Sequence, residues 1–213
     1  MLIELYADIA CPWCYIGERR LAEALRQRPE IEVERRWRPF QLQPDLPPEG
    51  LPWAEFVPAK FGSAAQAQRI FARVAQAGAP DGIDFRFDRV ATAPNTADAH
   101  RLVLFAAERD QEWPMADALY AAHFTEGRDL NDPDQLVAVA EGVGLDGAEV
   151  RAYLASDAGI AEVEASQEQA ERLGITGVPF YVIDGRYGLS GAQPVEVFVR
   201  ALDELTRPAI RIA

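Results

Sequence analysis

The chain has 213 residues, of which 49% are apolar and 26% are charged, proportions that are ordinary for a folded protein and exclude wholesale disorder. At about 150 residues per domain, this length predicts one large domain or one domain that carries a big insertion. The 21 basic and 34 acidic side chains give a net charge of −13, which argues against a nucleic-acid partner because polyphosphate is repelled.

The first residues lack a basic segment, an apolar core and a small-residue cleavage site, so we expect no signal peptide. Apolar stretches elsewhere are interrupted by charges well before the about 18 residues that a membrane span needs, so no membrane partner is expected. We therefore expect a cytoplasmic protein. In that compartment a cysteine pair is more often redox-active or metal-binding than a structural disulfide.

The N-terminal part predicts a strand, a helix and a second strand. Residues 2–7 form a short apolar run, residues 12–28 place apolar side chains at helical spacing after Pro12, and residues 31–37 alternate with a period of two. A right-handed crossover then makes the two strands parallel. Four prolines between residues 41 and 52 exclude regular structure there and indicate a boundary.

Residues 53–173 show almost only helical patterns, and the period of two returns beyond residue 174. Residues 180–183 and 187–190 predict a hairpin around Asp184 and Gly185, followed by a helix from Pro194.

These patterns predict an α/β fold, βαβ…ββα, with a large inserted all-helical domain. The predicted domains are 1–50 together with 174–213, and the insertion 51–173. Residues 206–213 are expected to form a loosely ordered tail.

The sequence Cys11-Pro12-Trp13-Cys14 places two thiols at the start of the first predicted helix. Side chains three residues apart on a helix lie about 5–6 Å apart at Cβ, which lets the sulfurs bridge with small adjustment. Such a bridge closes a very short loop and stabilises the fold little, so its value is chemical. The helix N-terminus favours the thiolate of Cys11, whereas Cys14 is expected to be more buried. This asymmetry predicts an attacking thiolate and a resolving thiol.

Three other interpretations of the cysteine pair stay open at this point. One is a buried, unreactive pair, and another is a redox site that has become a binding site. The third is a structural zinc site, which needs four ligands. The two histidines, His100 and His123, lie far away in the insertion, so we expect no metal site.

A second motif, Thr-Gly-Val-Pro-Phe at residues 176–180, directly precedes a predicted strand. A proline there suits either the first position of a strand or a cis turn, and taken alone the segment is also an ordinary helix-to-strand loop.

Segments spread over nearly the whole chain carry a family resemblance. They are DIACPWCYIG at residues 8–17, NTADAH at 95–100, GVPF at 177–180 and SGAQ at 190–193. The chain resembles thioredoxin-fold oxidoreductases of the DsbA family with a helical domain inserted between the two halves. The resemblance is to the cytoplasmic FrnE-like branch, which is close to 2-hydroxychromene-2-carboxylate isomerases and kappa-class glutathione transferases.

The resemblance implies that Pro179 is cis and packs against the sulfur of Cys11, which acts as the exposed nucleophile. Val178 would offer its backbone to a bound polypeptide or thiol, so that an extended substrate adds beside the site as a short β-strand.

It also implies that residues 95–100 begin a helix of the insertion and face the cleft. Judged without the resemblance, Asn95 suits a helix N-cap and His100 an ordinary half-buried helix position.

The chain departs from DsbA itself at Trp13, where DsbA has a histidine. A cation there would stabilise the Cys11 thiolate and make the disulfide a strong oxidant, which an indole cannot do. Asp8 and the net charge of −13 act in the same direction. We therefore expect a couple less oxidising than that of DsbA, suited to reducing or isomerising disulfides in the cytoplasm. In the isomerase and transferase relatives a serine stands at the position of Cys11, so the retained pair argues against their chemistry.

The expected function is that of a protein thiol–disulfide oxidoreductase with Cys11 and Cys14 as catalytic residues. The residues expected to shape the site or bind substrate are Pro12, Trp13, Val178, Pro179, Asn95 and His100. No cofactor is expected beyond the redox-active disulfide and glutathione as an optional co-substrate. The expected partners are disulfide substrate proteins or small thiols, and the oligomeric state stays open. The alternatives are a glutathione-dependent isomerase or transferase and a non-redox peptide-binding chaperone.

Overall fold

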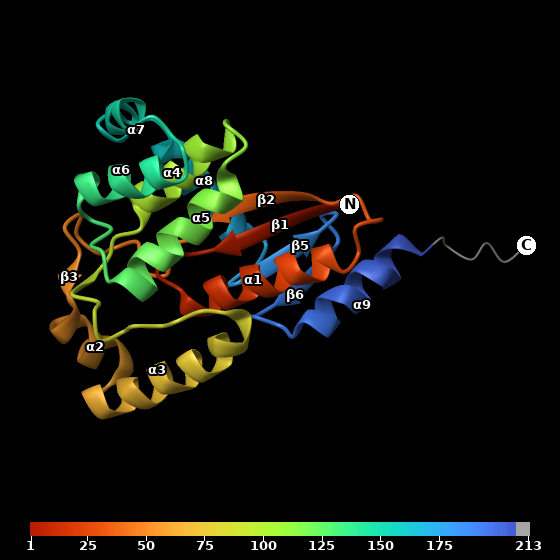
Figure 1. Ribbon diagram of the computed structural model, residues 1–213, viewed down its shortest axis with the longest axis horizontal. Helices are drawn as coiled ribbons and strands as arrows, with labels where there is room; N and C mark the ends of the chain where they lie inside the picture. The colour runs from red at the N-terminus through yellow and green to blue at the C-terminus, as the bar shows by residue number, and fades with distance from the viewer. Residues whose placement is uncertain (208–213) are drawn as a thin grey trace, which may run out of the picture.

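A four-stranded sheet forms the centre of the molecule. The computed structural model describes residues 1–207, so most of the predicted tail at 206–213 lies outside the described residues. The strands are β1 (Leu2–Ala7), β2 (Glu34–Pro39), β5 (Phe180–Ile183) and β6 (Tyr187–Ser190), in the order β2-β1-β5-β6 (Figure 1). Strand β1 is parallel to β2 and antiparallel to β5, and β5 is antiparallel to β6. The predicted βαβ and ββα halves are therefore confirmed, and they share one sheet.

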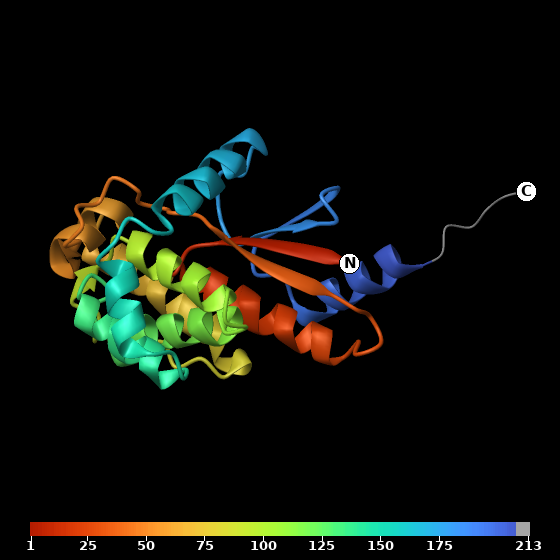
Figure 2. The same cartoon turned by 90° about the horizontal axis from the view of Figure 1, so that it is seen from above.

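Helices cover both faces of this sheet. Helices α1 (Pro12–Arg26) and α9 (Val195–Thr206) lie side by side on one face, and α8 (Ile160–Arg172) lies on the opposite face (Figure 2). Phe198 of α9 meets Tyr181 of β5 edge to face, with the ring centroids 4.9 Å apart. Burial of these aromatic rings fixes α9 against the sheet that also supports α1.

Strand β2 begins three residues later than the alternation predicts. The backbone N–H of Glu34 donates to Met1 at 2.9 Å and that of Phe40 donates to Ala7 at 3.0 Å, so β1 sets both ends of its partner. Ile31 instead closes a turn, since its N–H donates to the carbonyl of Arg28 at 3.0 Å. Pairing with β1 decides the strand, because alternation alone does not show where a ladder starts.

The insertion is helical except for one short ladder. Its elements are α2 (Trp53–Phe61), α3 (Ala64–Gly78), a 3₁₀ turn (Ala79–Asp81), α4 (Ala97–Ala107), α5 (Glu112–Ala121), a π-helical turn (Ala122–Glu126), α6 (Pro133–Gly142) and α7 (Gly147–Leu154). Strands β3 (Leu51–Pro52) and β4 (Thr92–Ala93) pair antiparallel. The expectation of an all-helical insertion is corrected by this ladder, which is too short to produce a period of two.

Helix α8 packs on the sheet as well as on the insertion. Ala170 of α8 and the following Ile175 form a buried cluster with Tyr6 and Phe40 at the ends of β1 and β2. The helix also contacts α4. The predicted end of the insertion at residue 173 therefore lies between two residues, Ala170 and Ile175, that belong to one buried cluster.

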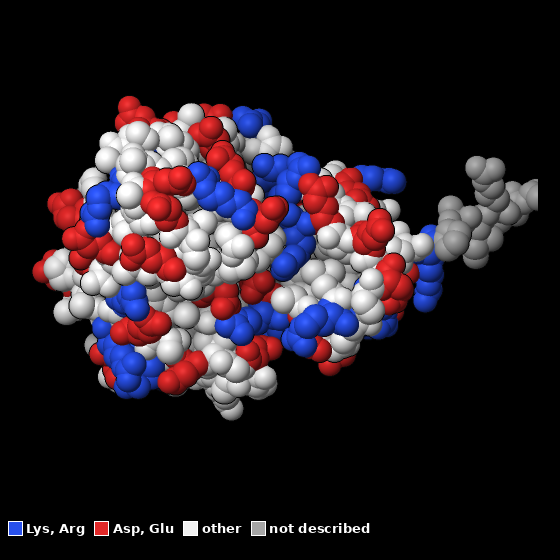
Figure 3. All heavy atoms as spheres, turned by 45° about the horizontal axis from the view of Figure 1, so that its top comes forward, with Lys and Arg blue, Asp and Glu red and all other residues white. Residues whose placement is uncertain are grey.

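The described surface carries charges of both signs. On the face drawn in Figure 3, basic side chains are interspersed with acidic ones. Arg28 donates to both carboxylate oxygens of Asp203, at 2.6 and 2.8 Å, and so joins the end of α1 to α9. Among the helices of residues 1–207, none is long and apolar enough to cross a membrane.

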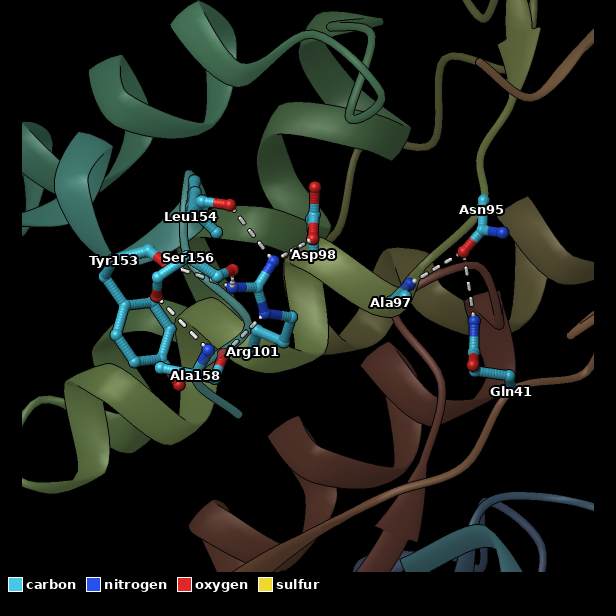
Figure 4. Close-up of polar contacts among 9 residues, drawn as sticks. All are labelled: Gln41, Asn95, Ala97, Asp98, Arg101, Tyr153, Leu154, Ser156 and Ala158. Atoms are coloured by element: carbon cyan, nitrogen blue, oxygen red, sulfur yellow. Dashed lines mark hydrogen bonds and ion pairs between the residues drawn. The ribbon is translucent and has the colours of Figure 1, made fainter. Parts of the chain in front are cut away.

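A buried arginine holds the insertion together. Arg101 of α4 is 4% exposed, and its guanidinium donates to the four backbone carbonyls of Tyr153, Leu154, Ser156 and Ala158 between α7 and α8, at 2.5–3.2 Å (Figure 4). It also pairs with Asp98 one turn earlier, at 2.7 Å. One cation therefore satisfies carbonyl groups that end α7 and lead into α8.

We expect Arg101→Met to lower the free energy of unfolding by about 3 kcal/mol, because it leaves these carbonyls without their charged donor. Arg151→Met is the matched control, since Arg151 forms an exposed pair with Asp134, and such pairs contribute less than about 1 kcal/mol. Urea denaturation measures both. Equal losses for the two variants would contradict the role given to Arg101.

Candidate active site

The cysteine pair lies where β1 passes into α1. Cys11 occupies the N-cap position, Pro12 is the first helical residue, and Cys14 follows one turn later. Both cysteines are free thiols, 5% exposed at Cys11 and 0% at Cys14. The sulfur at the N-cap lies at the positive end of the helix dipole. Cys11 is the outer of the two thiols as predicted, but it is itself buried, so the expectation of an exposed nucleophile is corrected.

The loop before β5 reaches the outer thiol. The Val178–Pro179 peptide bond is cis, as the resemblance implies. The carbonyl oxygen of Val178 accepts a hydrogen bond from the Cys11 thiol, with Sγ 3.6 Å away. Thr176 and Gly177 before it are exposed. The structure therefore brings Cys11, Val178 and Pro179 together across 167 residues of sequence.

A glycine in α1 permits this close approach. A Cβ atom at Gly17 would overlap the hydroxyl of Tyr181 and lie 3.1 Å from Cγ of Pro179. Tyr181 is fully buried, so its ring has no room to retreat. Gly17 follows Cys14 by one helical turn, and its missing side chain lets the cis-proline loop and β5 lie against the helix that carries both thiols.

The inner thiol is held in its protonated form. Burial raises the pKa of Cys14 well above its usual value, and the neighbouring Cys11 sulfur and the negative charge of Asp8 raise it further. Cys14 is also one of the groups that raise the pKa of the buried phenol of Tyr120. Cys14 therefore reacts as a resolving thiol only after it has lost its proton.

Asp8 connects the site to its surroundings. Its carboxylate accepts hydrogen bonds from the backbone N–H groups of Ala10, at 3.1 Å, and Leu42, at 2.7 Å. Its own carbonyl accepts from the N–H of Cys11 at 3.0 Å and from the hydroxyl of Tyr120 at 3.2 Å. Asp8 is 1% exposed, so a buried carboxylate fixes the segment that leads into the cysteine pair.

His100 lies behind Asp8 and does not face the cavity beside Cys11. It is fully buried, and the indole N–H of Trp37 donates to its Nδ1 at 3.3 Å, which places the ring proton on Nε2. Nε2 lies 3.4 Å from Oδ1 of Asp8. The expectation that His100 faces the cleft is thereby corrected, because the helix turns this side chain toward the sheet.

Asn95 also reaches the site indirectly. Its side-chain oxygen accepts from the N–H of Ala97 at 3.0 Å and from the amide of Gln41 at 3.2 Å (Figure 4). Its side-chain nitrogen donates to the carbonyl of Leu46 at 2.6 Å. Asn95 therefore ties the proline-rich linker to the start of α4, where Thr96 takes the N-cap position.

An apolar cavity of about 190 Å³ adjoins Cys11. Pro12 and Trp13 form one side of it, and side chains of α2, α3 and the linker form the other. Its aromatic lining consists of Trp13, Trp53, Phe56, Phe61, Phe71, Phe87 and Phe124. The insertion thus covers the cysteine pair with an aromatic wall.

His123 also lines this cavity, and sequence reasoning missed it. The sequence indicates His123 only as a distant candidate zinc ligand, because nothing in it predicts the π-helical turn that carries this residue to the cavity beside Cys11. The aromatic residues of α2 and α3 are a sequence signal for the cavity, although such residues equally predict an ordinary hydrophobic core. Within residues 1–207, no three His, Cys, Asp or Glu side chains are grouped to hold a metal ion.

Comparison with known proteins agrees with this geometry. A family model described as the DSBA-like thioredoxin domain matches residues 2–203. A crystal structure described as a probable DsbA oxidoreductase from Streptomyces coelicolor shares 39% identity and a TM-score of 0.90, over 100% of this chain and 94% of that one. The uncharacterized Bacillus subtilis protein YwbO is 30% identical over 95% of this chain and 96% of its own. A 2-hydroxychromene-2-carboxylate isomerase of Sphingobium xenophagum is 24% identical over 85% of this chain and 88% of its own.

We expect Gly17→Ala to destabilise the fold by about 1–3 kcal/mol, because the clash with Tyr181 outweighs the about 1 kcal/mol that alanine gains over glycine in a helix. Adding Tyr181→Phe removes the clashing hydroxyl and should restore most of the loss. Gly142→Ala in α6 is the control, since nothing lies within 4 Å of a Cβ there. Urea denaturation of the three variants decides, and a stable Gly17→Ala protein would refute the packing argument.

We expect Asp8→Asn to lower the pKa of Cys14, since it removes a negative charge that raises that pKa. At neutral pH the resolving step should accelerate by about threefold for each unit of decrease, because the tenfold gain in thiolate is partly offset by lower nucleophilicity. Stopped-flow release of the second coloured thiolate from a symmetric aromatic disulfide measures this step. Asp117→Asn removes a half-buried carboxylate of α5 that pairs with Arg19 and is not among the groups that shift the pKa of Cys14, so it should leave the rate unchanged. A slower step in Asp8→Asn would show that Asp8 instead removes the proton of Cys14.

Proposed function

The chain belongs to the family of DsbA-like thioredoxin domains, and from that premise we propose that it is a thiol–disulfide oxidoreductase with Cys11 and Cys14 as its redox centre. Proteins of this family act on thiol or disulfide substrates. The observation that carries the proposal is the arrangement around Cys11. Its sulfur caps α1, contacts the carbonyl of Val178 and lies directly outside a buried thiol.

In the reducing direction the Cys11 thiolate attacks one sulfur of the substrate disulfide. That bond breaks, the other substrate sulfur leaves as a thiolate and takes a proton, and a mixed disulfide joins Cys11 to the substrate. Cys14 loses its proton and attacks Sγ of Cys11, which releases the second substrate thiolate. The protein loses two electrons and the substrate gains them. Because the chain has two cysteines, a thiol of another molecule must reduce the Cys11–Cys14 disulfide again.

An extended substrate segment fits beside Val178. Residues 176 and 177 are exposed and Val178 is partly exposed, so backbone groups next to the cis bond are accessible from solvent. A polypeptide that pairs with this backbone would place its disulfide at the sulfur of Cys11.

The couple is proposed to be less oxidising than that of DsbA, in keeping with a cytoplasmic reductase or isomerase. Trp13 supplies no positive charge to Cys11. The negative charge of Asp8 is one of the causes that raise the pKa of Cys14. A redox titration against glutathione or dithiothreitol measures the potential, and a value as high as that of DsbA would refute this part of the proposal.

A second candidate is a glutathione-dependent isomerase that acts on a small aromatic compound. The relative of Sphingobium xenophagum and the aromatic cavity beside Cys11 favour it. The retained Cys11 argues against it, because the resemblance places a serine at that position in such enzymes. Saturable glutathione binding with turnover of an aromatic electrophile would establish this second activity.

Insulin reduction and refolding of scrambled ribonuclease test the proposed function. Cys11→Ser should abolish both activities with the fold intact, because the remaining thiol, Cys14, is fully buried. Cys14→Ser should accumulate mixed disulfides with substrates, since the resolving thiol is missing. Circular dichroism controls for folding, and an active Cys11→Ser protein would refute the assignment.

A further inference from the structure

The cavity beside Cys11 has the size of a small ligand. An apolar cavity of about 150 Å³ accepts benzene, so the volume of about 190 Å³ found here suits one substituted aromatic ring. Helices α2 and α3 close it on the side away from the cysteines. The cis-proline loop is not part of its lining. The cavity is therefore a separate approach to the same sulfur, distinct from the exposed backbone at Val178.

Lys60 and His123 are two of the polar residues that interrupt the aromatic lining, beside Gln43. Lys60, at the end of α2, is the single lysine of a chain with a net charge of −13, and it is the one cation in the wall as described. It is exposed, and no carboxylate of residues 1–207 forms an ion pair with it. An unpaired cation at the edge of an apolar cavity is complementary to an anionic group on an otherwise apolar ligand.

His123 is the second polar group. It is 1% exposed, and burial lowers its pKa to about 4, so the ring is neutral at physiological pH. Its Nδ1 atom has no hydrogen-bond partner among the described residues. Because this nitrogen is itself buried, His123 adds a neutral ring to the wall and leaves Lys60 as the one cation of the lining.

We propose that the cavity binds a small aromatic thiol or disulfide that carries an anionic substituent such as a carboxylate. The proposal rests on the redox function of Cys11 and names a substrate class for it. The ring lies among the aromatic side chains, the anionic group lies at Lys60, and the sulfur lies at Cys11.

The reaction with such a disulfide is balanced within the molecule. The Cys11 thiolate attacks one sulfur of the aromatic disulfide, the S–S bond breaks, and one aromatic thiolate leaves. Cys14 gives up its proton and attacks Sγ of Cys11, and the second aromatic thiolate leaves. Two electrons pass from the protein to the disulfide, and two aromatic thiolates and one protein disulfide result.

The test compares two aromatic disulfides with the reduced protein. One is 5,5′-dithiobis(2-nitrobenzoate), which carries a carboxylate on each ring, and the other is 4,4′-dithiodipyridine, which is uncharged at pH 8. Lys60→Gln should reduce the second-order rate constant for the anionic disulfide about threefold to fivefold, and change that for the neutral one less than twofold. Lys60→Arg should retain most of the preference. Arg200→Gln, which removes an exposed cation from α9, is the matched control and should change neither rate.

A measurement of insulin reduction distinguishes the failure of this inference from the failure of the proposed function. If the wild-type protein fails to reduce insulin, the proposed function fails. If it reduces insulin but Lys60→Gln, like Arg200→Gln, changes the rate constants for the two aromatic disulfides by the same factor, the subsite is refuted and the function stands. If Lys60→Gln lowers insulin reduction by the same factor as the anionic disulfide, the cavity serves polypeptides, and the small-ligand proposal is overturned.

Discussion

The four residues between β1 and α1 are the constraint on which the site depends, and Asp8 determines their shape. Its carboxylate ties this turn to the linker at Leu42, while its carbonyl is shared by the N–H of Cys11 and the phenol of Tyr120 from the insertion. Sheet, linker and insertion therefore meet at a residue three positions before the nucleophile. Since Asp8 is also charged and buried, the same group that positions Cys11 sets the electrostatic environment of Cys14.

The parts of the site that local patterns specify could be predicted from the sequence. A cysteine pair at a strand-to-helix junction is a local pattern and indicated a redox pair, whereas the proline before a strand was equally compatible with an ordinary loop, and only the family resemblance indicated that it faces Cys11. His100 and His123 show what such reasoning cannot reach. Whether a helical histidine faces a cavity or the sheet depends on the rotation of its helix, and His123 lies in a π-helical turn that shifts this rotation. Gly17 was likewise unpredictable, because its role exists only once Tyr181 lies against α1.

The insertion has two effects on one sulfur. Through Tyr120 it supports the turn below Cys11, and through α2 and α3 it encloses the apolar space beside it. The carbonyl of Val178, next to the cis bond, contacts the same sulfur. On the proposals made above, one thiol would then serve both a polypeptide at the cis-proline loop and a small ring in the cavity, and the helical cover would add the second option without removing the first.

Trp13 links these two features. A charged histidine at this position would stabilise the Cys11 thiolate, but it would also place a cation in the aromatic wall, where desolvation is costly. The indole instead completes the wall of the cavity. On the proposals made above, the residue that lowers the oxidising power of the pair is also the residue that completes a site for an apolar ligand. On this argument, replacing Trp13 by histidine should raise the redox potential and weaken the reaction with small aromatic disulfides together, because one side chain determines both properties.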